Sequence, residues 1–117
     1  MKIEAFYQSV GGDYREASAR LQSDALIGKF LLKFPLDPSH QDLQKARAAG
    51  DIQAAFRAVH TLKGVAATLG LERLRAAASA LTEELRPLAA FPEDRFFGTV
   101  DAEYEAVLAA IREMQAD

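Results

Sequence analysis

The sequence predicts an all-α fold: an antiparallel up-down four-helix bundle with short additional N-terminal helices. Apolar residues recur at intervals of three and four along most of the chain, which is the spacing of one helix face. No segment alternates apolar and polar residues in the manner of a half-buried strand, so we expect no sheet. The connections between the long amphipathic segments are short, which favours antiparallel neighbours.

Two short helices are expected at the N-terminus, packed at one end of the bundle. Apolar residues from Ile3 onward suggest the first, which the pair Gly11-Gly12 should stop. Asp13 can then cap a second helix that runs through Leu21, because its carboxylate can accept a hydrogen bond from a free backbone N–H.

A third helix should begin at Ser23 or Asp24, either of which can cap it. Pro35 should end this helix, because proline lacks an N–H and restricts the residue before it. Its apolar residues form a strong stripe, which predicts a core-facing side. The stripe consists of Leu26, Ile27, Phe30, Leu31 and Phe34.

The fourth and central helices follow. The fourth is expected from Asp37-Pro38, an N-cap followed by proline at the first helical position, to about Ala49. The pair Gly50-Asp51 should close it and cap the central helix, which should end at Gly70 in a left-handed C-terminal cap. One side of the central helix is apolar and should be buried. That side comprises Ala55, Ala58, Val59, Leu62, Val65, Ala66 and Leu69.

Two further helices complete the predicted bundle. One should run from about Glu72 to Arg86, where Pro87 ends it. The last should begin between Pro92 and Thr99 and reach about Met114. The expected inner positions are Leu74, Ala77, Ala78, Leu81 and Leu85 on the first, and Val100, Tyr104, Val107, Leu108 and Ile111 on the second.

The opposite side of the central helix has an unusual composition. His60 shares it with Phe56, Lys63, Gly64 and Ala67, at the spacings of three, four and seven that define one helix face. A glycine inside a helix costs about 1 kcal/mol relative to alanine. Its place beside a histidine therefore suggests that another molecule's backbone approaches closely here.

These residue types favour phosphoryl chemistry. Imidazole, with an unperturbed pKa of about 6.5, can act as a neutral nucleophile near physiological pH. A histidine nucleophile can hold a group covalently and divide one transfer into two easier steps. Lys63, one turn away, is a point charge suited to phosphate oxygens. The face is thus typical of a phosphate relay surface, without the parts of a complete catalytic site.

The segment His60-Thr-Leu-Lys63-Gly64-Val-Ala-Ala-Thr-Leu-Gly70-Leu-x-x-Leu74 resembles the signature of histidine-containing phosphotransfer (HPt) domains of two-component phosphorelays. The resemblance covers roughly residues 11 to 115. Its flanking matches are Phe30-x-x-x-Phe34, Leu43, Gly50-Asp51 and Leu81-x-Glu83.

The resemblance implies that His60 accepts a phosphoryl group from a receiver-domain aspartate and donates it to another. The implied partners are response-regulator receiver domains and a sensor or hybrid histidine kinase. The receiver would bring its own Mg²⁺ and lysine, so no cofactor and no metal are expected on this chain. Lys63 would offset phosphate charge, and Gly64 would leave room for the partner. Phe56 and Ala67 are either docking residues or the edge of the core.

Some positions depart from the family pattern. Related domains often place a polar group on the following helix to hydrogen-bond the imidazole, and Thr82 stands there in this sequence. Its side chain is short, and Ser79 or Glu83 could substitute. His40 lacks the lysine and glycine that accompany His60, so we expect it to be solvated and inert.

Composition limits the alternatives. A length of 117 residues fits one domain, residues 1–117. A net charge of −3 with interspersed signs gives no footprint for nucleic acid, and the absence of cysteine excludes disulfides. No apolar run is long enough to cross a membrane, and the N-terminus lacks a signal-peptide pattern. We therefore expect a cytoplasmic, monomeric protein that binds neither nucleic acid nor membrane.

Two other classes of function remain besides a phosphate relay, namely a binding module and a metal-dependent or hydrolytic enzyme. The chain lacks a glycine-rich phosphate loop, so autonomous kinase activity is not expected. Two histidines without metal-ligand spacing argue against a metal-dependent or hydrolytic enzyme. The remaining alternative is a helical-bundle binding module that docks receiver or kinase partners without being phosphorylated.

Overall fold

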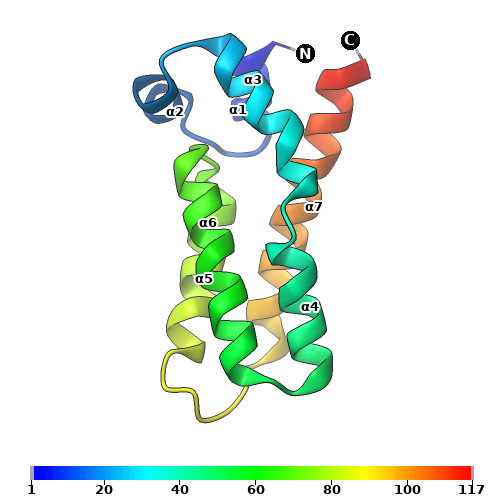
Figure 1. The fold of residues 1–117 in the computed structure, drawn as a ribbon. Coiled ribbons are helices and arrows are strands. Elements are labelled where there is room, and N and C mark those ends of the chain that lie inside the picture. The colour runs from blue at the N-terminus through cyan, green and yellow to red at the C-terminus, as the bar shows by residue number, and fades with distance from the viewer. Residues whose placement is uncertain (1, 117) are drawn as a thin grey trace.

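The computed structural model describes residues 2–116, and within that range the chain is all-helical with no strand. Figure 1 shows the arrangement of the helices. In chain order they are α1 (Ile3–Ser9), α2 (Tyr14–Leu21), α3 (Asp24–Lys33), a 3-10 turn η1 (Phe34–Leu36), α4 (Ser39–Ala49), α5 (Ile52–Thr68), α6 (Glu72–Leu85) and α7 (Asp94–Ala116). The predicted fold class is confirmed.

Helices α4 to α7 form the up-down bundle. α5 packs against both α4 and α6, and α6 packs against α7. In Figure 1, α3 leads down into α4, while α7 runs the whole height of the molecule and ends beside the N-terminal helices. The closely packed pairs of the bundle are therefore α4 with α5, α5 with α6, and α6 with α7.

The helix boundaries follow from local capping, much as predicted. The side chains of Asp13, Ser23 and Asp51 each accept a hydrogen bond from the backbone N–H three residues on, at 2.9, 3.1 and 3.0 Å. Gly50 and Gly70 both adopt positive φ, 70° and 66°, and provide the left-handed turns at which α4 and α5 end.

The start of α4 differs slightly from the prediction. The helix begins at Ser39, so that proline occupies the position before it. Asp37 still contributes, because its Oδ1 accepts a hydrogen bond from the Ser39 N–H at 2.9 Å. The carboxylate thus satisfies a free donor of the first turn even though it lies one residue further out.

The apolar stripe of α3 is only half buried. Ile27, Leu31 and Phe34 lie in the core, whereas Leu26 and Phe30 are 38% and 39% exposed. α3 is at the edge of the molecule, with α1, α2 and η1 as its main neighbours. An edge helix has fewer neighbours than its apolar arc can contact, so the prediction that the whole stripe is core was wrong.

The prediction for His40 was also wrong. Its side chain is 6% exposed, its Nε2 lies 2.8 Å from Oδ1 of Asp101, and its ring stacks on that of Tyr104 at 3.9 Å between centroids. Asp101 and Tyr104 are three residues apart on α7, so one face of that helix supplies both contacts. His40 joins α4 to α7, and only the packing of two distant segments could show it.

The N-terminal helices are attached to the C-terminal end of α5. The Tyr7 hydroxyl donates to the carbonyl of Leu69 at 2.6 Å, and the N–H of Asp13 donates to the carbonyl of Gly70 at 2.8 Å. A Cβ on Gly70 would lie 2.7 Å from the Asp13 carbonyl oxygen. Gly70 is therefore needed twice, for its positive φ and for the close approach of this backbone.

Candidate functional site

His60 lies in α5 with its side chain exposed, whereas nearby apolar residues of the same helix point into the core. Val59 and Leu62 are fully buried, and Val65 is half buried. The helical period that places these apolar residues in the core turns the imidazole toward solvent. The central geometric expectation from the sequence, an exposed imidazole in the middle of the bundle, is what the structure contains.

Phe56 lies beside the imidazole. The two ring centroids are 6.0 Å apart, with 30° between the ring planes. Phe56 is also approached by Arg86, the residue that follows α6, whose guanidinium carbon lies 5.5 Å from the ring centroid. This distance is within the range of a cation–π contact. Phe56 is half buried, so it is at once core edge and part of the surface next to His60.

A charged pair follows on the same side. The Glu83 carboxylate accepts hydrogen bonds from Nε and Nη2 of Arg86 at 2.9 and 2.6 Å. The pKa of Glu83 is lowered by this hydrogen bonding and by the nearby charges of Arg86 and Lys63. Glu83 is therefore ionised in its pair with Arg86. Sequence reasoning did not identify Arg86 as a neighbour of Phe56. Its spacing of three residues from Glu83 is, however, a recognisable signal for an ion pair.

Gly64 has no structural reason to be glycine. It lies within α5, it is exposed, and a Cβ built on it would meet nothing within 4 Å. Alanine would favour the helix by about 1 kcal/mol. The glycine thus leaves open space on the exposed surface of α5, where another molecule can approach the helix backbone.

Lys63 and Ala67 complete the predicted face. Both are half buried, and both belong to α5 together with His60, Phe56 and Gly64. The Ala67 carbonyl accepts a hydrogen bond from the guanidinium of Arg20 on α2. The predicted docking surface therefore borders the N-terminal helices at its upper end.

Thr82 is placed differently from the expectation. Its side chain is fully buried, and its hydroxyl donates to the carbonyl of Ala78 one turn earlier at 2.7 Å. Helical threonines commonly satisfy their hydroxyl in this way. Among the hydrogen bonds of residues 2–116, none joins Thr82 to His60. Of the two other candidates for support of the imidazole, Glu83 is bound to Arg86, and Ser79 is half buried on α6.

The surface around His60 is open. A shallow hollow of about 340 Å³ lies beside it, lined by Phe56, Arg57, His60 and Thr61. Arg57, one turn before His60, is a further cation that sequence reasoning did not single out. Between residues 2 and 116 there is no group of three or more side chains able to hold a metal ion. The arrangement can present a nucleophile to another macromolecule.

The fold and this surface define a helical-bundle module that exposes a histidine among cationic and apolar neighbours. The chain belongs to the Hpt domain family, because the family model for the Hpt domain matches residues 36–113, more than half of its length. Hpt domains take part in histidine phosphotransfer in phosphorelays, as carriers and not as kinases. No curated protein and no solved structure matches the chain.

The matched range contains α4, α5 with His60, α6 and α7 except for its last three residues, and it leaves α1 to α3 outside. None of the helices described in residues 2–116 combines the length and apolar character required to cross a membrane.

Proposed function

We propose that this chain relays a phosphoryl group between receiver-domain aspartates through a phosphohistidine at His60. The single observation that supports this most directly is the exposed imidazole of His60 beside Gly64, where a Cβ would meet nothing. A partner can approach the ring along that side of α5. Family membership supports the general reaction, and the geometry supports the choice of residue.

The chemical step is a displacement at phosphorus. The unprotonated Nε2 of His60 donates its lone pair to the phosphorus of a receiver's aspartyl phosphate, forming the N–P bond as the P–O bond to the aspartate breaks. The aspartate leaves as a carboxylate. The reverse step, on a second receiver, restores the free imidazole. Such a transfer depends mainly on positioning and on neutralisation of charge.

The neighbours of His60 have separate roles in this proposal. Lys63 offsets the negative charge of the phosphoryl oxygens, and Gly64 gives clearance for the receiver's backbone. Phe56 and Ala67 contribute apolar contact area for docking. The Mg²⁺ that phosphoryl transfer requires would come with the receiver domain, and the first phosphate would come from a sensor or hybrid histidine kinase. A monomeric state and a cytoplasmic location are part of the same proposal.

The test is a phosphotransfer profile of the purified chain against radiolabelled, phosphorylated receiver domains of its own organism. The wild type should become labelled, with a bond that is lost in acid and stable in alkali, and His60→Gln should not. A label on His60→Gln would overturn the assignment. If no receiver transfers while one still binds, the chain is the non-phosphorylated docking module instead.

A second pair of variants tests the charge at Lys63. Lys63→Gln should slow transfer by about tenfold or more, because a charge next to the transferred group is lost. Lys63→Arg keeps the charge and should retain most of the rate. Equal rates for Lys63→Gln and the wild type would remove Lys63 from the proposal without affecting His60.

A further inference from the structure

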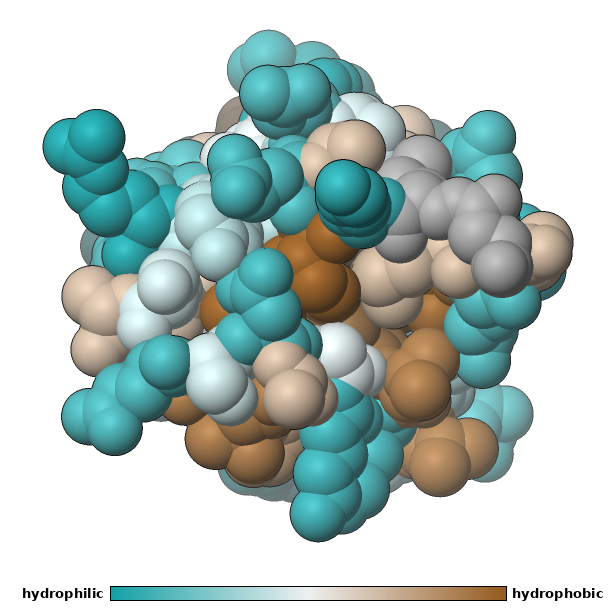
Figure 2. Space-filling view, turned by 90° about the horizontal axis from the view of Figure 1, so that it is seen from above, coloured by the Kyte–Doolittle hydropathy of each residue, from teal (hydrophilic) through white to brown (hydrophobic). Residues whose placement is uncertain are grey.

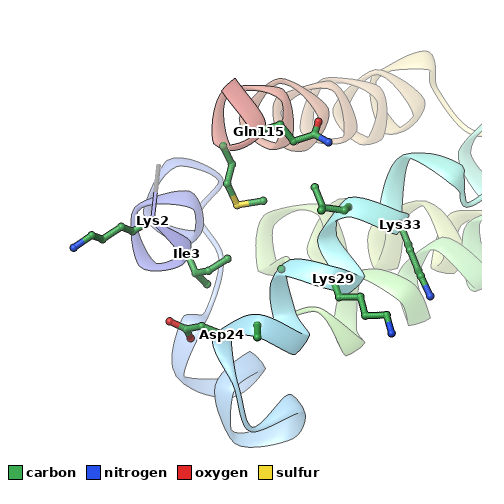
Figure 3. Close-up of a pocket in the computed structure, with 10 residues that line it drawn as sticks. Lys2, Ile3, Asp24, Lys29, Lys33 and Gln115 are labelled. Carbon is green, nitrogen blue, oxygen red and sulfur yellow. The ribbon is translucent and has the colours of Figure 1, made fainter. Parts of the chain in front are cut away.

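An open groove of about 1030 Å³ lies between α1, α3 and the last turns of α7. It is at the end of the molecule where the two chain termini lie, and Figure 3 shows it at close range. None of its lining residues comes from α5, the helix of His60. The groove is therefore separate from the surface assigned to phosphotransfer.

The floor of the groove is apolar. Ile3 of α1, Leu32 of α3 and Met114 of α7 line it, and Leu32 remains 46% exposed. Gly28 widens the groove, because it has no side chain at a position where a Cβ would lie 3.8 Å from the Ile3 side chain. Seen from this end, apolar side chains are visible between hydrophilic ones (Figure 2). The fold thus leaves a large aliphatic side chain uncovered in a hollow.

The rim of the groove is cationic. Lys2, Lys29 and Lys33 line it, three of the five lysines in a chain whose net charge is −3. Neither Lys29 nor Lys33 forms an ion pair with any residue in the range 2–116. Asp24 is the acidic residue on the lining, and its Oδ1 already accepts a hydrogen bond from the Tyr14 hydroxyl at 2.6 Å.

We propose that this groove binds an amphipathic α-helix of a partner protein, with apolar residues on one face and acidic residues along its flanks. A helix lies in an apolar groove through residues at i, i+3, i+4 and i+7. Lys29 and Lys33 are one turn apart, so their charges are spaced about 6 Å along the α3 axis. Carboxylates one turn apart on the bound helix have the same spacing.

The opposite rim supports the same occupant. Lys2 lies on the α1 side of the groove, across from Lys29 and Lys33 on α3, and its side chain extends outward from the rim (Figure 3). Cations on both edges with an aliphatic floor between them complement a helix that is acidic on both flanks. A membrane surface fits less well, because the apolar residues line a hollow, whereas insertion into a bilayer requires them to protrude.

The test uses the full chain and two synthetic helical peptides, measured by fluorescence anisotropy. Both peptides have leucines at i, i+3, i+4 and i+7. One has glutamates on the flanks, and the other has lysines at the same positions. The acidic peptide should bind at least about tenfold more tightly, and its affinity should fall as salt is added.

Three variants localise the binding. Leu32→Glu should lower the affinity for the acidic peptide by about tenfold or more. The double change Lys29→Glu with Lys33→Glu should do the same. Leu36→Glu is the matched control, because Leu36 is 81% exposed and does not line the groove. Circular dichroism verifies that all three variants remain folded.

Several results would overturn the proposal. These are equal binding of the two peptides, unchanged affinity of Leu32→Glu, preference for phosphatidylglycerol vesicles over the acidic peptide, and a self-association that Leu32→Glu abolishes. Phosphotransfer to wild type and Leu32→Glu is measured in parallel and should be equal. A failure of peptide binding is then distinguishable from a failure of the phosphotransfer proposal.

Discussion

Nε2 of His40 lies 2.8 Å from Oδ1 of Asp101, an aspartate 61 positions later in the chain. The same fold that exposes His60 on α5 thus buries the other histidine between α4 and α7. A buried polar group needs its hydrogen-bond partner, since a lost partner leaves the desolvation cost uncompensated. His40 is therefore structural in this molecule.

The first prediction concerns this contact. Asp101→Ala should lower the free energy of unfolding by about 1–2 kcal/mol, because the buried imidazole loses its partner. Urea denaturation measures the change. Asp94→Ala is the matched control: Asp94 also bridges α4 and α7, through Arg47, but its side chain is 94% exposed. Exposed pairs contribute little, so a comparable loss in Asp94→Ala would contradict the interpretation.

The second prediction separates stability from function at Gly64. Gly64→Ala should raise the free energy of unfolding by about 0.5–1 kcal/mol, because alanine is the better helix former and its Cβ meets nothing. The same change should slow phosphotransfer from a receiver, since the added methyl occupies the clearance beside His60. Thermal unfolding and a transfer time course measure the two effects.

Gly98 provides the control for Gly64. It also lies within a helix, α7, it is also exposed, and a Cβ there would likewise meet nothing within 4 Å. Gly98→Ala should stabilise the chain to a similar extent and leave transfer unchanged. Slower transfer in Gly98→Ala would show that helix stiffening, and not steric clearance, is the cause.

The third prediction compares two left-handed glycines. Gly50→Ala introduces a side chain at φ 70° with open space around it, so it should cost about 1–2 kcal/mol. Gly70→Ala should cost clearly more, because its Cβ would also lie 2.7 Å from the Asp13 carbonyl oxygen. Urea denaturation of both variants gives the difference, which reports the contact between the N-terminal helices and the end of α5. Equal costs would mean that this contact relaxes freely.

The fourth prediction concerns pH. Burial raises the pKa of the Tyr7 phenol, with smaller contributions from the charges of Asp24 and Tyr14. The folded chain therefore keeps the Tyr7 proton at a pH where the unfolded chain, with a tyrosine pKa of about 10, loses it. The stability from this group is fully present below pH ~10 and is lost as the pH rises above that value.

Tyr7→Phe tests this prediction. The variant should be less stable near neutral pH, because the Leu69 carbonyl loses its hydrogen-bond donor. Its stability should also fall less steeply than that of the wild type above pH ~10. Unfolding measured at several alkaline pH values provides the slopes. Parallel slopes for the two proteins would exclude Tyr7 as the source.

Much of the helical framework could be predicted because it depends on local interactions. Asp13, Ser23 and Asp51 act as caps through hydrogen bonds that reach only three residues along the chain. The burial of Val59 and Leu62, and the exposure of His60, follow from the period of a single helix. The signature around His60 lies within one such helix, so the candidate nucleophile was accessible to sequence reasoning.

The contacts of His40, Phe30 and Arg86 could not be predicted, since they depend on which helices become neighbours. His40 is buried because α7 presents Asp101 and Tyr104 at the start of α4. Arg86 reaches Phe56 because α6 packs along α5, and Phe30 is exposed because α3 lies at an edge. The sequence by itself determined the helices, most of their ends and the face that bears His60. Only the tertiary structure decided which side chains from different helices contact each other and which apolar residues of the edge helix stay exposed. The reason is that the relative register of distant helices is set by packing and not by local periodicity.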